Sequence, residues 1–168
     1  MSWNAPATAT VGQVLTAAFL NTNLRDNLLW LGTRKWLHAT SPGLSLAASS
    51  IQTVTFNTKV VDTDSFLNLS PGTTPTIPTG LDGIYFVHMY ATFSATFTGN
   101  QVFRMGGCTG FPQATYDSPL QPGSVSGLWS ATFGPFPIGA GANFIAQMFS
   151  TVAATCTLVR LHLVWAGR

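Results

Sequence analysis

The run of residues 84–97 constrains the fold most, because it is β-prone and apolar on both faces of the strand that it predicts. Side chains alternate between the two faces of a strand. One face carries Tyr85, Val87, Met89, Ala91, Phe93, Ala95 and Phe97, and the other begins with Ile84, Phe86, His88 and Tyr90. A strand that is apolar on both faces is expected to be covered on both. In a two-layer sandwich the second cover is usually a neighbouring subunit, so this run predicts a sandwich that assembles with copies of itself.

Short β-prone runs separated by turns fill the rest of the chain after residue 34. The turns carry Pro71-Gly72, Thr79-Gly80 and Asp82-Gly83, and such glycine and proline pairs typically interrupt regular structure. Further strands are expected at residues 50–56, 101–105, 127–133, 143–149 and 154–165. Short strands with turn signals roughly every 8–12 residues are typical of sandwiches and barrels. We therefore expect a mainly β fold, an antiparallel sandwich of about eight strands over residues 34–168.

Residues 1–33 differ in character from the rest, and they begin as an extended arm rich in Ala, Thr and Pro. A short α-helix is predicted next, because Thr16 can cap its first turn, Leu15 and Leu20 can form a hydrophobic staple, and Gly32 can end it. An isolated helix of about fifteen residues is marginal in water, so this helix needs a surface to pack on. We therefore expect residues 1–33 to serve anchoring or oligomerisation. The expected anchoring residues are Trp3, Leu15, Leu20, Leu24, Leu28 and Leu31, of which the last four form one stripe of the helix.

Charged residues make up only 7% of the chain, and glutamate is absent, whereas about 25% is ordinary for a globular domain. So little charge is typical of membrane proteins or of chains that bury much of their surface in an assembly. The apolar runs are too short for a spanning helix of roughly 20 residues, and the amino terminus lacks the pattern of a secretory signal. The net charge of +2 comes without the basic stripe that nucleic-acid binding requires. We therefore expect assembly with other proteins, no membrane insertion and no nucleic-acid partner.

Catalytic constellations are missing from the sequence. No serine lies in a Gly-x-Ser-x-Gly turn, and five aspartates without a glutamate make paired carboxylates hard to assemble. The glycine-rich segment 106–110 lacks the lysine and the following helix of a phosphate-binding loop. We therefore expect no enzymatic activity, no cofactor and no resident metal.

Two groups of ionisable residues leave alternatives open. Asp62 and Asp64 could hold Ca²⁺, although an Asx-stabilised turn is the more ordinary use of such a pair. His38, His88 and His162 are isolated from one another along the chain, but His88 and His162 lie within expected strands and could approach each other or line a threefold axis. Zinc would need three or four converging ligands, so structural roles are favoured for all three histidines.

Cysteines and aromatic residues leave two further alternatives. Cys108 and Cys156 lie among apolar and small residues, which favours buried free thiols over a bridge between them. Aromatic side chains of the carboxy-terminal half could stack on host glycans, but packing in the core or at a subunit interface is favoured in so apolar a chain. These are Trp129, Phe133, Phe136, Phe144 and Phe149.

Residues 12–31 read Gly-Gln-Val-Leu-Thr-Ala-Ala-Phe-Leu-Asn-Thr-Asn-Leu-Arg-Asp-Asn-Leu-Leu-Trp-Leu. This segment resembles the opening segment of many small structural proteins of tailed phages that infect actinobacteria, often described as minor tail or capsid decoration proteins. The shared pattern is a glycine, a short apolar pair, Thr-Ala, Leu-Asn and Arg-Asp-Asn-Leu. The resemblance implies a protein of the virion, assembled in the host cytoplasm, that binds the major capsid protein or tail proteins.

A second resemblance is carried by Val54, Phe56, Asn57, Asp62, Phe66, Thr76, Pro78, Gly83, Tyr85, Phe86 and Val87. Residues 54–97 are similar to the jelly roll shared by the globular heads of complement's first component and the tumour-necrosis-factor family. In that fold the Gly-x-Tyr-x-Val strand lies at the heart of the sandwich, and three subunits pack around a threefold axis. The resemblance implies a jelly-roll homotrimer. The strand expected to build its core and its trimer contacts carries Tyr85, Phe86, Val87, Tyr90 and Phe93.

These features together predict a homotrimeric phage virion protein that decorates the capsid exterior, with residues 1–33 docked to the shell and the jelly roll outward. A tail-tip or fibre module that binds a host-surface glycan or receptor is the main alternative, and an outward aromatic or polar pocket would distinguish it. A secreted adhesin or toxin-like trimer is a more distant alternative, which the missing secretory signal disfavours.

Overall fold

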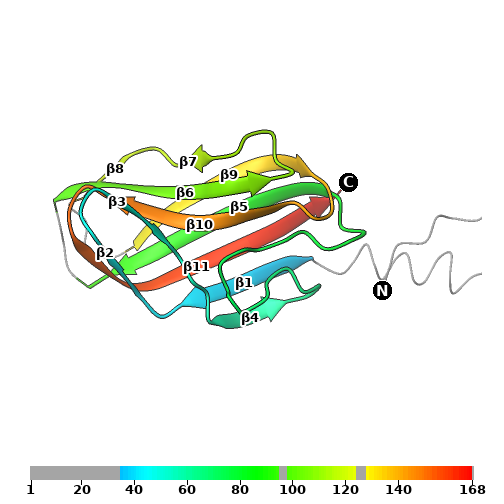
Figure 1. Cartoon of the computed structure of the whole chain (residues 1–168), viewed down its shortest axis with the longest axis horizontal. Helices are drawn as coiled ribbons and strands as arrows, with labels where there is room; N and C mark the ends of the chain where they lie inside the picture. The colour runs from blue at the N-terminus through cyan, green and yellow to red at the C-terminus, as the bar shows by residue number, and fades with distance from the viewer. Residues whose placement is uncertain (1–34, 95–97, 124–127, 168) are drawn as a thin grey trace, which may run out of the picture. The chain divides into compact units, whose positions relative to one another are not determined.

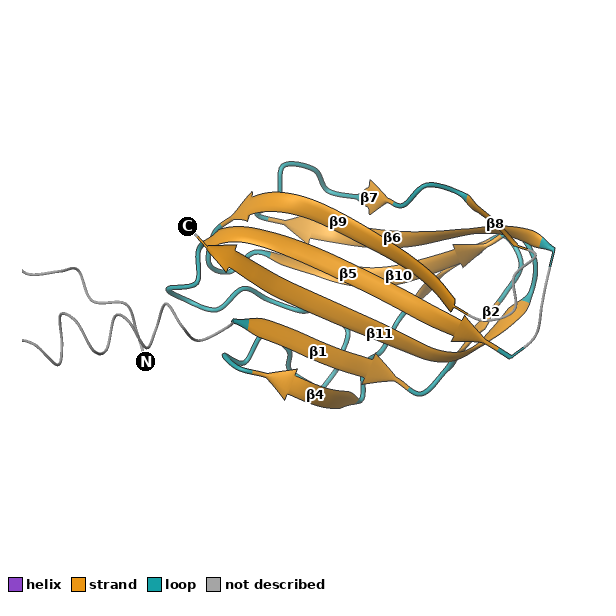
Figure 2. Cartoon of the chain, turned by 180° about the vertical axis from the view of Figure 1, so that it is seen from behind, coloured by secondary structure: helices purple, strands orange, loops and turns teal. Residues whose placement is uncertain are grey.

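The computed structural model describes residues 35–94, 98–123 and 128–167, which form eleven strands and no helix (Figure 1). Every pairing between these strands is antiparallel. The strands make two sheets that lie face to face, and Figure 2 shows the same pair of sheets from behind. The fold is an antiparallel jelly-roll sandwich, which confirms the predicted fold class. The predicted arm and helix, with Trp3 and the five leucines named for anchoring, lie outside the described residues, so this part stays a prediction.

The six-stranded sheet has the order β4–β1–β11–β5–β9, and β2 also pairs with β11. The bounds are β1 Trp36–Ser41, β2 Leu44–Leu46, β4 Thr58–Asp62, β5 Gly83–Phe93, β9 Leu128–Ile138 and β11 Ala154–Gly167. The strand β11 is central, because it pairs with β5 along one side and with β1 and then β2 along the other.

The five-stranded sheet has the order β3–β10–β6–β7, and β8 also pairs with β6. The bounds are β3 Ser50–Thr53, β6 Gly99–Thr109, β7 Tyr116–Asp117, β8 Gln121–Gly123 and β10 Asn143–Ser150. The chain passes from one sheet to the other several times, so neighbouring strands in a sheet are often distant in sequence.

Alternation along each strand packs one face of each sheet into a shared core. In β5, the side chains of Tyr85, Val87, Met89 and Ala91 have no exposed surface, while the residues between them are half-buried or exposed. Burying one large apolar side chain contributes about 1.5–3 kcal/mol. The facing strands β6 and β10 contribute the buried residues Phe103, Met105, Phe144, Ala146 and Met148. The predicted inward face of this strand, with Tyr85, Val87, Met89 and Ala91, is therefore confirmed.

Strand number and strand bounds differ from the prediction in ways that have local causes. The observed count exceeds the expected eight, and β1 and β4 lie outside the predicted runs; β2, β7 and β8 are only two or three residues long. So few residues cannot display an alternation. The expected run at residues 84–97 appears as β5, which ends at Phe93, and residues 95–97 lie outside the described part.

The Asp62 carboxylate stabilises the loop after β4 by accepting hydrogen bonds from its backbone. Its Oδ1 accepts a hydrogen bond from the backbone N–H of Phe66 at 2.7 Å, and its Oδ2 accepts one from Leu67 at 3.3 Å. The Lys59 ammonium lies 3.0 Å from the same carboxylate, and Lys35 lies 3.2 Å from Asp64. These contacts turn Phe66 and Leu67 into the core, where both are buried. The two hydrogen bonds to Asp62 reach four and five residues along the chain, whereas an Asx turn joins the side chain to the residue two positions on, so the Asx-turn interpretation of this pair is not confirmed.

Within the described residues, no helix has the length and apolar character needed to cross a membrane.

Candidate functional site

All three histidines of the chain lie in one row on the outer face of the six-stranded sheet. In the strand register, His38 of β1 lies opposite His162 of β11, which lies opposite His88 of β5. The row continues to Thr132 of β9, whose hydroxyl is 2.8 Å from the His88 Nδ1. Figure 2 shows these four strands side by side. The sequence proposed that His88 and His162 approach each other, and the register confirms it.

Aromatic and aliphatic side chains flank this row. On one side, Trp36, Val164 and Phe86 form a parallel row across β1, β11 and β5. On the other side, Thr40, Arg160, Tyr90 and Ser130 form a third row, across β1, β11, β5 and β9. We name these three rows the histidine face; its members are Trp36, His38, Thr40, Phe86, His88, Tyr90, Ser130, Thr132, Arg160, His162 and Val164.

The face is apolar and cationic at the same time. The side chains of Phe86 and Val164 keep 37% and 38% of their surface exposed in the single chain, which is high for large apolar residues on a sheet. The guanidinium carbon of Arg160 lies 5.0 Å from the centre of the Tyr90 ring, a cation–π contact. This surface therefore presents aromatic rings and one permanent positive charge.

The two closest histidines have nitrogens that are buried without a hydrogen-bond partner. The ring centres of His38 and His162 lie 4.3 Å apart, edge to face, and those of His88 and His162 lie 6.0 Å apart. Within the described part of the chain, Nε2 of His38 and Nε2 of His162 find no donor or acceptor. A buried polar atom without a partner is costly unless something else covers and satisfies it.

Burial and positive neighbours lower the pKa of two of these histidines. For His38, burial is the larger cause and the charge of Arg160 the smaller. For His162, burial again comes first, followed by His38, His88 and Arg160. The neutral imidazole is therefore the favoured form of both side chains.

A metal centre does not follow from this row. Neighbouring strands are about 4.8 Å apart, so three rings opposite one another stand side by side rather than converging on one point. No set of three or more His, Cys, Asp or Glu residues in the described ranges could hold a metal ion. What the arrangement can do chemically is take up protons and stack against flat or apolar partners.

The structure separates the five residues named for core and trimer contacts into an inner pair, an outer pair and Phe93. Tyr85 and Val87 point inward and are fully buried, and the Tyr85 hydroxyl donates to the Leu81 carbonyl at 2.6 Å. Phe86 and Tyr90 lie on the histidine face, and Phe93 is half-buried at the end of β5. Only Phe86 and Tyr90 are thus placed to contact another molecule through this face.

The two cysteines are free. Cys156 is buried on β11, and Cys108 is half-buried on β6 of the other sheet. Burial raises the pKa of the Cys156 thiol to about 12 and that of Cys108 to about 11. Both are therefore unreactive thiols at neutral pH, and the alternative of a bridge between them is wrong.

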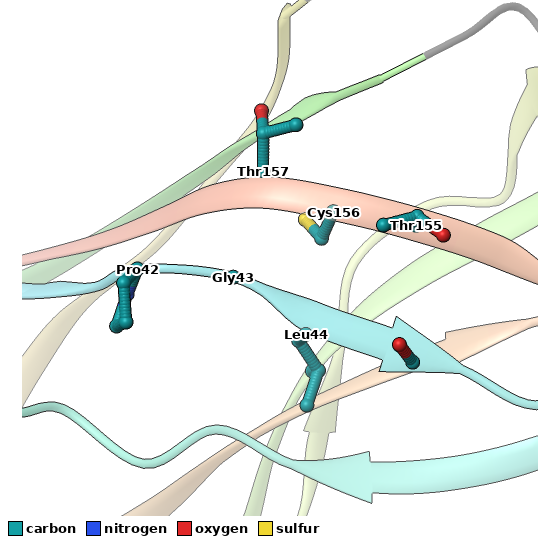
Figure 3. Close-up of a pocket in the computed structure, with 7 residues that line it drawn as sticks. Pro42, Gly43, Leu44, Thr155, Cys156 and Thr157 are labelled. Carbon is teal, nitrogen blue, oxygen red and sulfur yellow. The ribbon is translucent and has the colours of Figure 1, made fainter.

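An open hollow of about 420 Å³ lies where the turn between β1 and β2 meets β11 (Figure 3). Gly43 makes this close approach possible, because its φ is 151° and a Cβ there would lie 3.0 Å from the Cys156 carbonyl oxygen. The lining holds no charged side chain, and its thiol is unreactive, so the hollow offers no acid–base or nucleophilic chemistry. It is lined by Pro42, Gly43, Leu44, Ser45, Thr155, Cys156 and Thr157.

Most of the aromatic residues considered for glycan stacking belong to the core. Phe133, Phe136 and Phe144 are buried. Trp129 stacks on Phe103 with ring centres 4.1 Å apart and planes 10° apart. Phe149 is half-buried on the outer face of the five-stranded sheet. The core interpretation is confirmed for the first four, because they fill space between the sheets.

The outer face of the five-stranded sheet has a different character. Arg104 of β6 and Asp117 of β7 form a two-pronged ion pair, with N–O distances of 2.6 and 2.7 Å. Gln147 of β10 lies beside Arg104 in the register, and Thr53 of β3 lies beside Gln147. Ionisable groups here are thus paired within the chain.

The sequence missed His38 as a member of the site. Its strand, β1, pairs with β11, which is more than a hundred residues away in the chain. The available signal was the alternation of Trp36, His38 and Thr40 with the buried Leu37 and Ala39.

No protein-family model matches the sequence, and no curated protein matches it. The structure is similar to that of PRD1 vertex protein P5, with a TM-score of 0.62 at 15% identity, over 80% of this chain and 98% of that one. It is also similar to the globular domain of zebrafish complement 1qA protein, with a TM-score of 0.52 at 13% identity, over 78% and 95% of the two chains. Murine APRIL gives a TM-score of 0.52 at 18% identity, over 79% and 99%.

At such low identities these likenesses show the fold. The jelly-roll resemblance read from residues 54–97 is therefore confirmed as a fold, and it extends over about four-fifths of the chain. The resemblance of residues 12–31 to actinobacteriophage proteins stays a prediction.

Proposed function

We propose that this protein is a structural component of a bacteriophage particle, a homotrimer that decorates the capsid exterior. One observation carries the proposal: the jelly roll matches nearly the whole of a vertex protein, PRD1 P5, at a TM-score of 0.62. The jelly roll projects outward, and residues 1–33 dock to the underlying shell. The partners are two further copies of the chain and the major capsid protein or tail proteins, and the location is the virion.

The trimer forms through the histidine face. This face combines exposed Phe86 and Val164 with half-buried Trp36 and Tyr90. Aromatic residues such as Phe86, Trp36 and Tyr90 are enriched at the cores of protein interfaces. A neighbouring copy packed on this face would cover the outer side of β5, whose inner side already packs in the core. Apolar area removed from water contributes about 25 cal/mol per Å², so a buried face of ordinary interface size supports a stable assembly.

Docking to the shell depends on the predicted stripe of leucines on residues 20–31. A helix of about fifteen residues is marginal alone, so its apolar stripe gains stability only when it packs on another surface. The expected contacts are Trp3, Leu15, Leu20, Leu24, Leu28 and Leu31.

A tail-tip or fibre module for a host glycan is less well supported. Four of its five candidate stacking residues pack in the core instead, and the open hollow beside Cys156 carries no aromatic ring. Decoration of the capsid requires no such pocket.

Removing residues 1–33 tests the docking role directly. The truncated protein should remain a soluble trimer and lose binding to phage particles that lack the full-length protein, as measured by co-sedimentation. In the full chain, Leu24→Asp on the stripe should weaken particle binding at least tenfold, about 1.4 kcal/mol, while Asn23→Asp beside it should not. Particle binding by the truncated protein equal to that of the full chain would show that the docking surface lies in the jelly roll.

A further inference from the structure

Within the described residues, the histidine face holds no carboxylate. All three histidines and Arg160 lie there. The described carboxylates lie elsewhere: Asp62 ends β4, Asp64 follows it, Asp82 precedes β5 and Asp117 is on β7 of the other sheet. An added proton on this face therefore meets like charge.

The strands next to the central histidine present no carboxylate to it. His162 lies between His38 on β1 and His88 on β5. Arg160 lies two residues along the same strand and projects from the same face. Tyr90 contacts both, with its ring 6.0 Å from His162 and 5.0 Å from the guanidinium carbon. Among the described residues, each titratable neighbour of His162 is thus a histidine, an arginine or a tyrosine.

The outer strands of the sheet add no acidic neighbour either. On β4, Val61 lies opposite His38. The Lys59 and Asp62 side chains of the same strand form an ion pair with each other at 3.0 Å, opposite inward-facing residues of β1. On β9, the neighbour of His88 is the Thr132 hydroxyl at 2.8 Å.

Neutral and protonated imidazole therefore have opposite effects on this face. A neutral ring is flat and partly apolar, and its free nitrogen can donate to or accept from a covering molecule. A protonated ring carries a charge that is costly to remove from water without an anion. In a symmetric assembly the same rings of every copy gather at one interface, which multiplies the repulsion.

We propose that the row His38–His162–His88 makes self-association through the histidine face sensitive to protons, so that the assembly holds at neutral pH and dissociates in mild acid. The inference rests on the trimer proposed above. It adds a regulatory property: a particle that enters an acidic compartment or medium loses its decoration while each subunit stays folded.

The expected loss of assembly in acid agrees with the pKa shifts of the histidines in the single chain. The pKa values of His38 and His162 are lowered, mainly by burial, and covering the face with other copies extends that burial. The dissociated state therefore binds more protons than the assembly. The stability of the assembly is complete above the pKa that these rings have in the dissociated subunit, which lies below the ordinary value of about 6.5, and it declines as pH falls through that pKa.

Sedimentation of the full-length protein at fixed concentration and ionic strength, from pH 8 to pH 4.5, tests the inference. We expect a trimer at pH 7.5 and dissociation between about pH 6.5 and 5, with far-ultraviolet circular dichroism unchanged. Each histidine that must lose a proton on assembly lowers the association constant by up to about tenfold per pH unit. A monomer at pH 7.5 would overturn the proposed trimer, whereas a trimer that persists with equal affinity at pH 5 would overturn only the present inference.

Substitutions test whether the three histidines cause the pH dependence of assembly. Replacing all three histidines with glutamine, which does not titrate, should remove the pH dependence between pH 7.5 and 5. In that triple variant, Thr53→His restores a histidine on the outer face of the other sheet and should leave the assembly insensitive to acid. Equal dissociation midpoints for the wild type and the triple variant would show that other groups are responsible.

A measurement on the wild type alone keeps the inference testable if the triple variant fails to assemble. Nuclear magnetic resonance of the histidine ring signals gives a pKa for each ring in the assembly. The expected pKa values for His38 and His162 lie below that of a free histidine and fall further as the protein associates. Values at or above the free value would overturn the inference, because assembly would then take up protons.

Discussion

The outer faces of the two sheets obey the same alternation rule and yet differ in how their polar groups are satisfied. On the five-stranded sheet, the charge of Arg104 is matched by Asp117 at 2.6 Å. On the six-stranded sheet, two histidine nitrogens are buried without a partner, and Arg160 has a tyrosine ring rather than a carboxylate beside it. In the described part of the chain, these polar groups are thus satisfied on the first face and left without hydrogen-bond partners on the second, which is the face that we propose as the interface between copies.

The largest change in folding free energy is expected when a side chain on the inner side of β11 is compared with its neighbour on the outer side. Leu163→Ala removes a fully buried side chain and should cost about 2–5 kcal/mol of folding free energy. Val164→Ala, at the next residue, should change the folding free energy by less than about 0.5 kcal/mol and weaken association instead. Urea unfolding at several protein concentrations separates the two effects. A folding loss of similar size for both variants would contradict the assignment of Val164 to an interface.

A charge placed on each outer face should distinguish the two sheets. Phe86→Asp would bury a carboxylate in the proposed interface and should lower the association constant at least about a hundredfold. Gln147→Asp puts the same group on the outer face of the five-stranded sheet, beside Arg104, and should leave association unchanged. Sedimentation equilibrium at pH 7.5 measures both. If the second variant dissociates and the first does not, the interface lies on the other sheet.

The smallest effect is expected at the ion pair that completes the five-stranded sheet. Asp117→Asn removes the partner of Arg104 in a half-exposed position and should cost less than about 1 kcal/mol of folding free energy. The midpoint of thermal unfolding measures this loss, and the association constant should not change. A loss of assembly in this variant would mean that the paired face also takes part in contacts between subunits.

The sandwich could be predicted from sequence because its signal is local. The two-faced alternation of β5 is visible within one run of residues, and glycine and proline pairs mark the turns between runs. The short strands β2, β7 and β8 could not be predicted, since two or three residues show no period. Their positions are set by pairing with longer strands, which is a property of the folded chain.

The candidate site was only partly predictable for a related reason. That His88 and His162 share a face follows from alternation, but their being opposite depends on the register between β5 and β11. His38 joins them only because β1 pairs with the far end of the chain, and a slip by one residue would turn it inward. The polar loop around Asp62 could be predicted, but not the bonds that its carboxylate accepts from Phe66 and Leu67, because these residues lie beyond the reach of an Asx turn.

Hydroxyl-radical footprinting of the full-length protein across a range of concentrations tests the central claim most directly, because it measures which face is covered. The account predicts that oxidation of Phe86 and Tyr90 falls as the protein associates at pH 7.5, while oxidation of Ile51, which is 45% exposed on β3, stays constant. Oxidation of Phe86 and Tyr90 that does not change with association would contradict the account, since the histidine face would then remain open to water.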